Sequence, residues 1–415
     1  MPTARLYHSD PYLRDFQCRV LQSEPASRTS SPGPLFEVIT DVTAFYPNSG
    51  GQPSDRGTVA GVDVVDVIER EDEIVHLTVA AVPVGPAVGR VDADRRFDHM
   101  QQHTGQHILS GAFASLFGLE TVGFHMGEET VTIDLAAPDI TYDQAAAVER
   151  LACEVVFQNR PVTATFWTRE DLDTAHLRKI PARTENIRIV EVDEFDLTPC
   201  GGTHVRATGE VGLIKIIRTE RIRGLTRVEF VCGRRALADY RWKNDTVHAS
   251  ASMLSVHGRE LAEAVSRLQS QVKEAKRELE AVTSELRAYQ AAEMYRATPP
   301  LEPSGVRVLA RAFEGLDMNE LKSLTHKVAG HSRVVALFGS TCGPLAHLVF
   351  QKSEDLPDLN MFHLLKQVLP SVDGKGGGNP GLAQGGGKNP AGLSLALEQA
   401  SDIVAQALDS ANGTA

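Results

Sequence analysis

Residues 101–107 read Gln-Gln-His-Thr-Gly-Gln-His and place two histidines, His103 and His107, four positions apart. In an α-helix this spacing puts both imidazoles on one face, where they can converge on one ion. We predict that the helix begins near Asp98, a suitable N-cap, and ends at about Phe117, because Gly118 favours helix termination. The two histidines would then lie in the first half of the helix.

A second pair of ligand-type residues follows in Pro199-Cys200-Gly-Gly-Thr-His204. The Gly-Gly turn lets the backbone fold tightly, so one thiolate and one imidazole can face the same ion. Each pair alone is weak evidence, but together they form a His3Cys set. Mg2+ and Ca2+ prefer oxygen ligands and iron–sulfur clusters need more thiolates, so zinc is favoured. We expect one Zn2+ per chain, held by His103, His107, Cys200 and His204.

The proposed zinc site leaves one question of coordination open. Four protein ligands would close a tetrahedral site and make it structural. Either the zinc gains a fifth ligand when substrate or water binds, or one of the four residues lies outside the coordination shell. A zinc protease is excluded on sequence detail, because the Glu of the His-Glu-x-x-His motif is missing between His103 and His107.

Composition limits the class of protein. The 415 residues allow two to four domains, and the five cysteines show no paired spacing. The N-terminus lacks the apolar core of a signal peptide, and no run approaches the ~18 apolar residues of a membrane helix. We therefore expect a soluble protein in the reducing cytoplasm.

Net charge is −12, which argues against indiscriminate binding of nucleic acid. Between Val205 and Lys243, however, ten Arg or Lys stand against four acids, a local balance of +6. A solvated charged surface is the ordinary interpretation of such a segment. Because it adjoins Cys200 and His204, we favour a face that meets a phosphate-bearing substrate.

The pattern along the chain predicts a multidomain α+β protein. Residues 1–92 alternate apolar and polar positions between turn residues, which indicates a small N-terminal β-barrel. Residues 93–240 are expected to form the α+β domain that contains the zinc site. Its further elements would be strands at 131–135 and 187–192 and a helix at 142–159.

A helical segment is predicted for residues 241–298. Apolar residues from Leu261 to Tyr289 step alternately by four and three, which is a heptad seam. The seam could close as an antiparallel hairpin within the chain or as a homodimer through helix 261–289. After Pro299 and Pro300, residues 299–415 alternate strands and helices and are expected to be an α/β domain.

A glycine-rich stretch, 374–388, lies in the last domain. Glycines allow close approach of phosphate or sugar, and Lys375 and Lys388 flank the stretch, but the Gly-Lys-Ser/Thr end of a P-loop is missing. A flexible linker is one alternative. We favour a compact loop that opens the helix from Leu393, whose N-terminus would attract anions, so nucleotide or ATP binding is a further expectation.

The motifs, in this order, closely resemble the editing half of alanyl-tRNA synthetase and the freestanding alanyl-tRNA editing proteins of the long form. Residues 43–55, with Phe45-Tyr46 and Gly50-Gly51-Gln52, look like the family's barrel element. The segments at 103–107 and 200–204 match its bipartite zinc signature, and the Gly-rich segment matches its C-terminal domain. No segment ahead of the barrel could hold an aminoacylation domain, so we expect no charging activity.

The resemblance implies a zinc-dependent aminoacyl-tRNA hydrolase. Its substrate would be mischarged tRNA(Ala), chiefly Ser-tRNA(Ala) and secondly Gly-tRNA(Ala), with the basic segment 205–243 on the acceptor stem. A site that hydrogen-bonds a seryl hydroxyl would reject alanine, because its buried polar groups would lose their partner. Candidate catalytic residues are Thr104 and Thr132 for that hydroxyl, and Gln106 and His125 for positioning water or the ribose. Each has an equally ordinary interpretation as a structural polar residue.

Two other functions remain as alternatives. One is a tRNA-binding module whose zinc is purely structural. The other is a phosphoesterase related through the C-terminal domain, which is disfavoured because its Asp-His-His cluster is absent.

Overall fold

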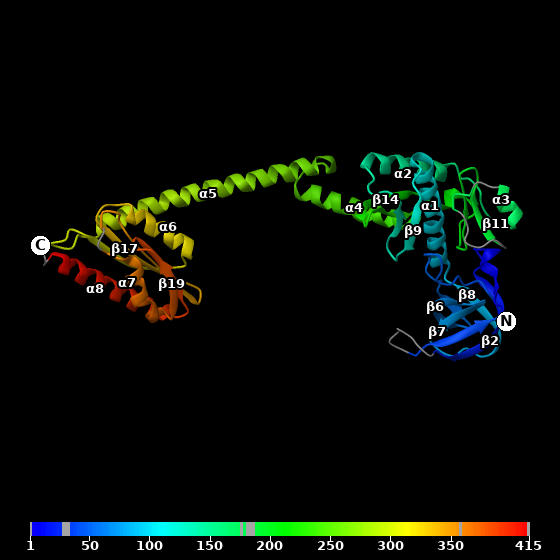
Figure 1. The fold of residues 1–415 in the computed structure, drawn as a ribbon, viewed down its shortest axis with the longest axis horizontal. Coiled ribbons are helices and arrows are strands. Elements are labelled where there is room, and N and C mark those ends of the chain that lie inside the picture. The colour runs from blue at the N-terminus through cyan, green and yellow to red at the C-terminus, as the bar shows by residue number, and fades with distance from the viewer. Residues whose placement is uncertain (1, 27–33, 175–176, 180–186, 357–358, 413–415) are drawn as a thin grey trace. The chain divides into compact units, whose positions relative to one another are not determined.

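The computed structural model describes residues 2–26, 34–174, 177–179, 187–356 and 359–412. The chain forms two compact units, residues 1–258 and 259–415. Each unit has hydrophobic clusters of its own, so each can be described by itself. The described residues contain eight α-helices and several sheets, as expected for a multidomain α+β protein (Figure 1).

The first sheet of unit 1 closes on itself in the strand order β2-β3-β7-β6-β5-β8. Alternate side chains point inward and form one cluster, which includes Val20, Val38 and Val67. β1 (Ala4–Arg5) and β4 (Val42–Thr43) form a separate parallel pair, and β4 ends at the first residue of the motif 43–55. The strands of the closed sheet are β2 (Asp15–Pro25), β3 (Phe36–Thr40), β5 (Gly57–Val59), β6 (Val62–Arg70), β7 (Glu73–Thr78) and β8 (Gly85–Val91).

Helix α1 (Ala93–Phe117) carries the two histidines of the quoted stretch. The predicted end is confirmed, because Gly118 takes the left-handed conformation with φ 64°. The predicted start at Asp98 is wrong. Asp92 is the N-cap and accepts hydrogen bonds from the backbone N–H groups of Asp94 and Arg95, while the Asp98 carboxylate pairs with Arg235. The first turn, residues 93–96, contains three charged residues, so the apolar periodicity did not indicate where the helix begins.

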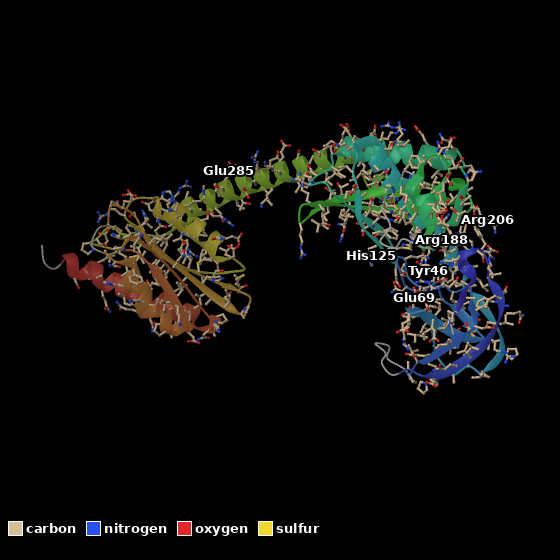
Figure 2. The ribbon with its side chains drawn as sticks, turned by 45° about the vertical axis from the view of Figure 1, so that its right-hand side comes forward. Tyr46, Glu69, His125, Arg188, Arg206 and Glu285 are labelled. Atoms are coloured by element: carbon tan, nitrogen blue, oxygen red, sulfur yellow. The ribbon has the colours of Figure 1, made fainter. Side chains whose placement is uncertain are left out.

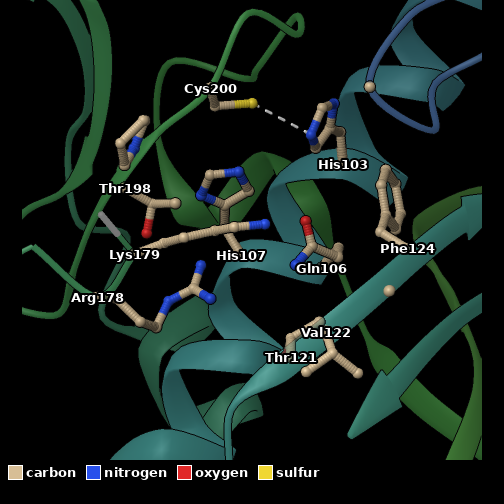
Figure 3. Close-up of a pocket in the computed structure, with 13 residues that line it drawn as sticks. His103, Gln106, His107, Thr121, Val122, Phe124, Arg178, Lys179, Thr198 and Cys200 are labelled. Carbon is tan, nitrogen blue, oxygen red and sulfur yellow. Dashed lines mark hydrogen bonds between the residues drawn. The ribbon is translucent and has the colours of Figure 1, made fainter. Parts of the chain in front are cut away.

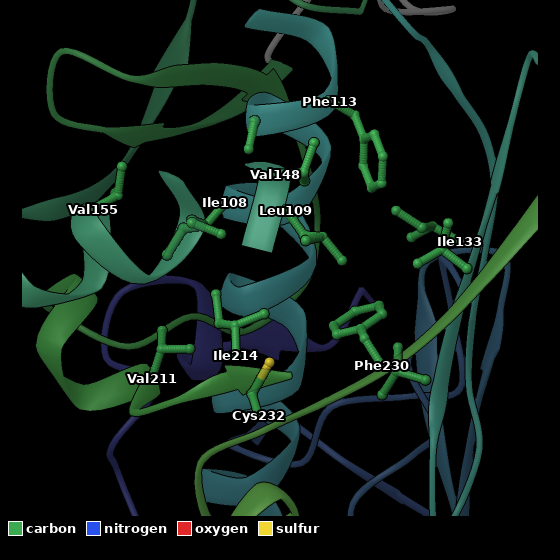
Figure 4. Packing of buried hydrophobic residues seen from close by; sticks show 14 of the residues in the cluster. Ile108, Leu109, Phe113, Ile133, Val148, Val155, Val211, Ile214, Phe230 and Cys232 are labelled. Atoms are coloured by element: carbon green, nitrogen blue, oxygen red, sulfur yellow. The ribbon is translucent and has the colours of Figure 1, made fainter. Parts of the chain in front are cut away.

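Helix α1 is buried along most of its length by the elements around it (Figure 4). An antiparallel sheet in the order β14-β15-β10-β9 and helix α2 supply Ile133, Val148 and Phe230 to its core. A second sheet runs β11-β12-β13. The expected strands at 131–135 and 187–192 are confirmed, and the helix expected at 142–159 ends slightly earlier. The elements are β9 (Thr121–Met126), β10 (Val131–Leu135), α2 (Tyr142–Phe157), β11 (Val162–Trp167), α3 (Arg169–Thr174), β12 (Ile187–Val192), β13 (Asp196–Pro199), β14 (Ile214–Ile222) and β15 (Leu225–Cys232).

Two long helices follow: α4 (Gly233–Met253) closes unit 1 and α5 (Leu261–Ala297) opens unit 2. On α5 only Ala264 and Ala291 are buried. Seam residues such as Val272 and Leu279 are 62% and 67% exposed. The seam is therefore present as a stripe on one helix, and a partner helix for it stays a prediction.

Unit 2 contains a five-stranded sheet in the order β16-β17-β18-β20-β19, in which β16 and β17 are parallel. Helix α6 packs with the end of α5 on one face, and α7 and α8 pack on the other. This unit therefore contains both strands and helices, as expected for residues 299–415. The elements are β16 (Arg307–Glu314), α6 (Met318–Ala329), β17 (Val334–Cys342), β18 (Leu345–Lys352), α7 (Met361–Val368), β19 (Gly374–Gly378), β20 (Leu382–Gly387) and α8 (Leu393–Asn412).

The glycine-rich stretch forms a hairpin, so the predicted loop is wrong. β19 and β20 pair in antiparallel register from Gly374 opposite Gly387 to Gly378 opposite Ala383. A Cβ at Gly376 or Gly385 would lie within about 3 Å of Leu365 or Leu369, so the glycines let the α7 segment pack directly on the strands. Residues 374–388 therefore form a paired hairpin instead of the compact loop expected, and nucleotide or ATP binding stays a prediction.

All five cysteines are free. Within the described ranges, no helix combines the length and apolar character needed to cross a membrane.

Candidate metal centre and its pocket

The two ligand pairs meet in the structure. Single ligand atoms of His103, His107, Cys200 and His204 all lie within 4.8 Å of one another. The Cys200 Sγ atom lies 3.3 Å from Nε2 of His103 (Figure 3) and 3.3 Å from Nε2 of His204. Ligands of a tetrahedral zinc, bound at about 2.0–2.3 Å, lie roughly 3.5 Å apart, so this spacing fits one such ion.

In each of the three histidines, a hydrogen bond at the ring nitrogen Nδ1 orients the imidazole and leaves Nε2 toward the metal site. Gln52 Oε1 lies 2.7 Å from Nδ1 of His103, and Asp196 Oδ2 lies 3.0 Å from Nδ1 of His107. Thr104 Oγ1 lies 3.1 Å from Nδ1 of His204. With Nδ1 occupied, Nε2 is the atom free to bind metal, which is how metal-ligating histidines are usually held.

Gln52 comes from the N-terminal barrel and is fully buried. Its Oε1 also accepts from Thr203 N, and its Nε2 donates to Thr203 Oγ1. Gly51 reaches this position with φ 84°, and its carbonyl accepts from the Met126 backbone N–H on β9. The barrel motif therefore completes the surroundings of the metal site.

The turn that carries Cys200 is held by a buried arginine. Arg188 on β12 donates from Nη1 to the carbonyls of Cys200 and Gly202, each at 2.9 Å. Arg188 also lies close enough to Tyr46 and Cys200 for both to affect its pKa, which burial lowers (Figure 2). At Gly202 a Cβ would lie 2.1 Å from the His103 ring, so only glycine fits there.

The charges of the site favour the thiolate. Burial alone would raise the pKa of the Cys200 thiol, but the imidazoles of His103, His204 and His107 lower it well below its usual value. Burial would lower the pKa of His107, yet Cys200 and Asp196 together raise it to about 9. Burial lowers the pKa of His204 to about 3. The thiolate is the form of cysteine that binds metal.

A cavity of about 230 Å³ opens against three of the four ligand residues, His103, His107 and Cys200. Figure 3 shows its walls, which come from α1, from the edge strand β9 and from residues 178–179 and 198–200. The side chains that bear on its chemistry are Gln106, Thr121, Phe124, Arg178, Lys179 and Thr198. Arg178 is engaged with the Asp196 carboxylate, at 2.5 Å.

The four candidate catalytic residues lie at different places. Gln106 lines the cavity. Thr104 is fully buried, and its hydroxyl contacts His204 and accepts from Val205 N. Thr132 and His125 are paired opposite each other on β10 and β9. Neither lines the cavity, and His125 is exposed (Figure 2).

The sequence interpretation missed several contributing residues. Gln52 stood inside the quoted barrel motif, but nothing local showed that its amide reaches His103. Asp196, Arg188 and Thr121 lie on ordinary strands, and no spacing marks them. The threonines that line the cavity are Thr121, eleven positions before Thr132, and Thr198.

The basic segment 205–243 is largely paired with acids. Eight of its ten Arg and Lys form ion pairs, most of them with carboxylates from outside the segment, such as Asp134 with Arg227. Its local charge of +6 is therefore largely offset in the fold. Several pairs are solvent-exposed, including those of Arg218 and Arg221.

Comparison with known proteins gives relatives that cover most of the chain. The chain is 30% identical over 405 residues to the alanyl-tRNA editing protein AlaX-L of Pyrococcus horikoshii, covering 92% of this chain and 94% of that protein. It is 31% identical over 403 residues to the alanine–tRNA ligase of Pyrococcus abyssi, of which it spans 42%. Residues 187–229 match the threonyl and alanyl tRNA synthetase second additional domain. A crystal structure of the C-Ala domain from Aquifex aeolicus alanyl-tRNA synthetase is 26% identical and covers 25% of this chain and 91% of its own, with a TM-score of 0.23.

Proposed function

Because this chain belongs to the alanyl-tRNA editing protein family, we propose that it hydrolyses the ester of mischarged tRNA(Ala), chiefly Ser-tRNA(Ala) and secondly Gly-tRNA(Ala). The observation that carries the proposal is the convergence of His103, His107, Cys200 and His204 at the wall of a cavity. A binding pocket that touches three metal-type ligands is suited to an ester hydrolase.

The donor set fits zinc, because it combines three imidazoles whose Nδ1 atoms are already engaged with one cysteine held as thiolate. A bound zinc ion would polarise the ester carbonyl or lower the pKa of a water molecule. The protein's own residues orient the site: Gln52, Asp196 and Thr104 fix the imidazoles, and Arg188 fixes the turn of Cys200. Phe124 supplies an apolar wall beside His103, and Val122 lines the same cavity.

The alternative is a tRNA-binding module with a purely structural zinc. Its support is the set of four protein ligands, which can close a tetrahedral shell. The open cavity against His103, His107 and Cys200 favours hydrolysis, because a structural site needs no such space. The two functions differ in whether purified protein releases the amino acid.

The proposed partner is tRNA(Ala) itself. Exposed ion pairs such as Arg221 with Asp139 contribute little stability, so phosphates can replace the carboxylates at small cost. The acceptor stem would lie over the segment 205–243, and unit 2 would make a more distant contact. A homodimer through the seam of α5 is part of the same proposal.

The test is deacylation of Ser-, Gly- and Ala-tRNA(Ala) by purified protein. We expect about one zinc per chain and hydrolysis of Ser-tRNA(Ala) faster than that of Ala-tRNA(Ala) by on the order of 10² or more. A chelator should abolish hydrolysis, and added zinc should restore it. Cys200→Ala should lose metal and activity, whereas Cys342→Ala, at a free cysteine of unit 2, should keep both.

Two results would contradict the proposal. Tight tRNA binding and bound zinc without release of serine would favour the structural-zinc alternative. Active protein that contains no zinc by elemental analysis would exclude the metal centre.

A further inference from the structure

We infer, on the basis of the proposed function, that Gln106 reads the seryl side chain: its carbonyl oxygen Oε1 accepts a hydrogen bond from the substrate hydroxyl. Gln106 lies between His103 and His107 on α1. It lines the cavity, although only 7% of its surface is exposed. A polar group so nearly buried has little water around it, so its hydrogen-bond partner matters for the free energy.

The orientation of the Gln106 amide is set from behind the cavity. Its Nε2 donates to Ser110 Oγ at 2.8 Å, one turn further along α1. Thr121 Oγ1, from the edge strand β9, donates to the same oxygen at 2.7 Å. The NH2 end is therefore turned toward Ser110, and Figure 3 shows Oε1 on the opposite side, toward His103 and Lys179.

The electrostatics of the cavity favour an acceptor at this point. Its walls contain Lys179 and also Arg178, which is paired with Asp196, and the Lys179 cation stabilises the negative end of the amide dipole. Thr198 also lines the cavity, but its hydroxyl donates to Asp196. Gln106 Oε1 is therefore an available neutral acceptor near the metal ligands.

A neutral acceptor suits a neutral donor. No Asp or Glu is among the described residues that line the cavity, so a charged α-ammonium would find no carboxylate there. A seryl hydroxyl matches the amide carbonyl without a charge to compensate. An alanyl methyl would displace water from Oε1 and leave the oxygen without a partner, which is how a hydrogen-bonding site rejects an analogue that lacks the hydroxyl.

Ser110 and Thr121 are positioning residues in this arrangement. Ser110 is 1% exposed and holds the NH2 end of the amide. If it is removed, the amide can rotate and present a donor in place of the acceptor. Loss of Ser110 should therefore weaken the discrimination even though its side chain does not line the cavity.

The experiment compares kcat/KM on Ser-, Gly- and Ala-tRNA(Ala), with glycine as the internal reference because it has no hydroxyl. Gln106→Leu should lower kcat/KM on the seryl substrate by about 10–100-fold, raise the alanyl value because no oxygen is left unpaired, and leave the glycyl value nearly unchanged. Ser110→Ala should lower the same Ser/Gly ratio by a smaller factor. Zinc content is measured in each variant, and both should retain one ion.

Gln102→Leu is the matched control. Gln102 is a fully buried amide on the same helix, but it bonds to the backbone of Cys232 and does not line the cavity. This substitution should lower the melting temperature without changing the Ser/Gly ratio. An equal fall on all substrates in Gln106→Leu, or an unchanged Ser/Gly ratio, overturns the inference alone. Wild-type protein that deacylates none of the three substrates overturns the proposed function and the inference together.

Discussion

Single residues away from the ligands decide how well the metal site is ordered. His107 is the clearest case, because the Asp196 carboxylate that holds its Nδ1 is almost fully buried and is itself held by Arg178. Burial would raise the pKa of Asp196, but His107 and Arg178 lower it to about 2. The carboxylate is therefore charged at neutral pH and fixes both the tautomer and the direction of the imidazole.

Asp196→Asn should weaken zinc binding by about 10–100-fold, because the neutral amide holds His107 less firmly and in either tautomer. The measurement is competition for zinc against a chelating dye. Asp134→Asn is the control, since Asp134 pairs with Arg227 away from the ligands and should leave the affinity unchanged. Equal zinc affinity in Asp196→Asn and wild type would show that the Asp196 carboxylate is not needed to orient His107.

His76 makes the stability of the barrel depend on pH. It is fully buried, between Thr43 Oγ1 and the Val38 carbonyl, and burial lowers its pKa to about 4 although the Val38 bond opposes this. In the unfolded chain this histidine binds a proton below about pH 6.5, whereas in the folded protein it does so only below about pH 4. The unfolding free energy is therefore highest above pH 6.5 and falls as the pH drops toward 4.

This residue should contribute about 2 kcal/mol of the loss in unfolding free energy between pH 7.5 and pH 5. His76→Gln does not titrate and should flatten the pH dependence by that amount, as measured by urea unfolding at several pH values. An identical pH dependence in variant and wild type would mean that other groups account for the loss.

Among the elements, helix α1 carries most of the site, because one buried helix presents both histidines and Gln106 to the same side. The elements that meet it are distant in sequence: the barrel turn at Gln52, β13 and the turn of Cys200. The metal site is thus assembled on a rigid helix rather than on a loop.

The β14–β15 hairpin should contact phosphates through Arg218, Arg221 and Arg223. The first two are in exposed ion pairs, with side chains 67% and 71% exposed. Replacing all three with Ala should weaken tRNA binding and reduce the slope of log K against log salt by about 2, because each phosphate contact contributes roughly 0.7–0.9. Filter binding across a salt series measures this.

The control for the hairpin is Arg70→Ala with Arg90→Ala, which removes exposed ion-paired cations of the barrel. This variant should keep the wild-type salt slope. If the two variants show the same slope of log K against log salt, the hairpin arginines make no specific contact with tRNA phosphates.

Helix α5 should dimerise through its seam. Leu279 and Leu286 are 67% and 55% exposed, and a row of such residues at heptad spacing is stabilised by a second helix. Leu279→Lys with Leu286→Lys should convert a dimer to a monomer in sedimentation equilibrium. Ser270→Lys introduces one lysine off the seam and should leave the dimer intact. A wild-type protein that is monomeric at every concentration would contradict the prediction.

For the whole molecule, the division into two units predicts that the metal site is independent of residues 259–415. The core around α1 belongs entirely to unit 1. A chain that ends at Gly258 should bind zinc and cleave a charged minihelix at close to the full-length rate. It should bind full-length tRNA(Ala) more weakly, with a flatter salt dependence, because the second contact is lost.

Comparison with the Leu279→Lys/Leu286→Lys variant separates tRNA contact from dimerisation. If the seam variant binds tRNA as weakly as the shortened chain, unit 2 contributes to tRNA binding by forming the dimer. If the shortened chain binds tRNA as tightly as the intact protein, unit 2 has another task.

The sequence by itself determined the features that depend on local pattern. The His103/His107 and Cys200/His204 pairs, the end of α1 at Gly118 and the strands at 131–135 and 187–192 follow from spacing, glycine conformation and apolar periodicity. Each of these signals depends on residues that are close together in the chain, so they can be recognised in a single sequence.

Only the tertiary structure decided what joins distant segments. Gln52 meets His103 across 51 positions and Asp196 meets His107 across 89, and no local pattern records such contacts. The same holds for the threonines that line the cavity, which are Thr121 and Thr198 rather than Thr132, and for the carboxylates that offset the basic segment. The Gly-rich stretch is a hairpin on which α7 packs, and α1 begins directly after Asp92, with Arg96 of its first turn buried in an ion pair with Asp55. Packing and long-range hydrogen bonds set these features, and they exist only once the chain has folded.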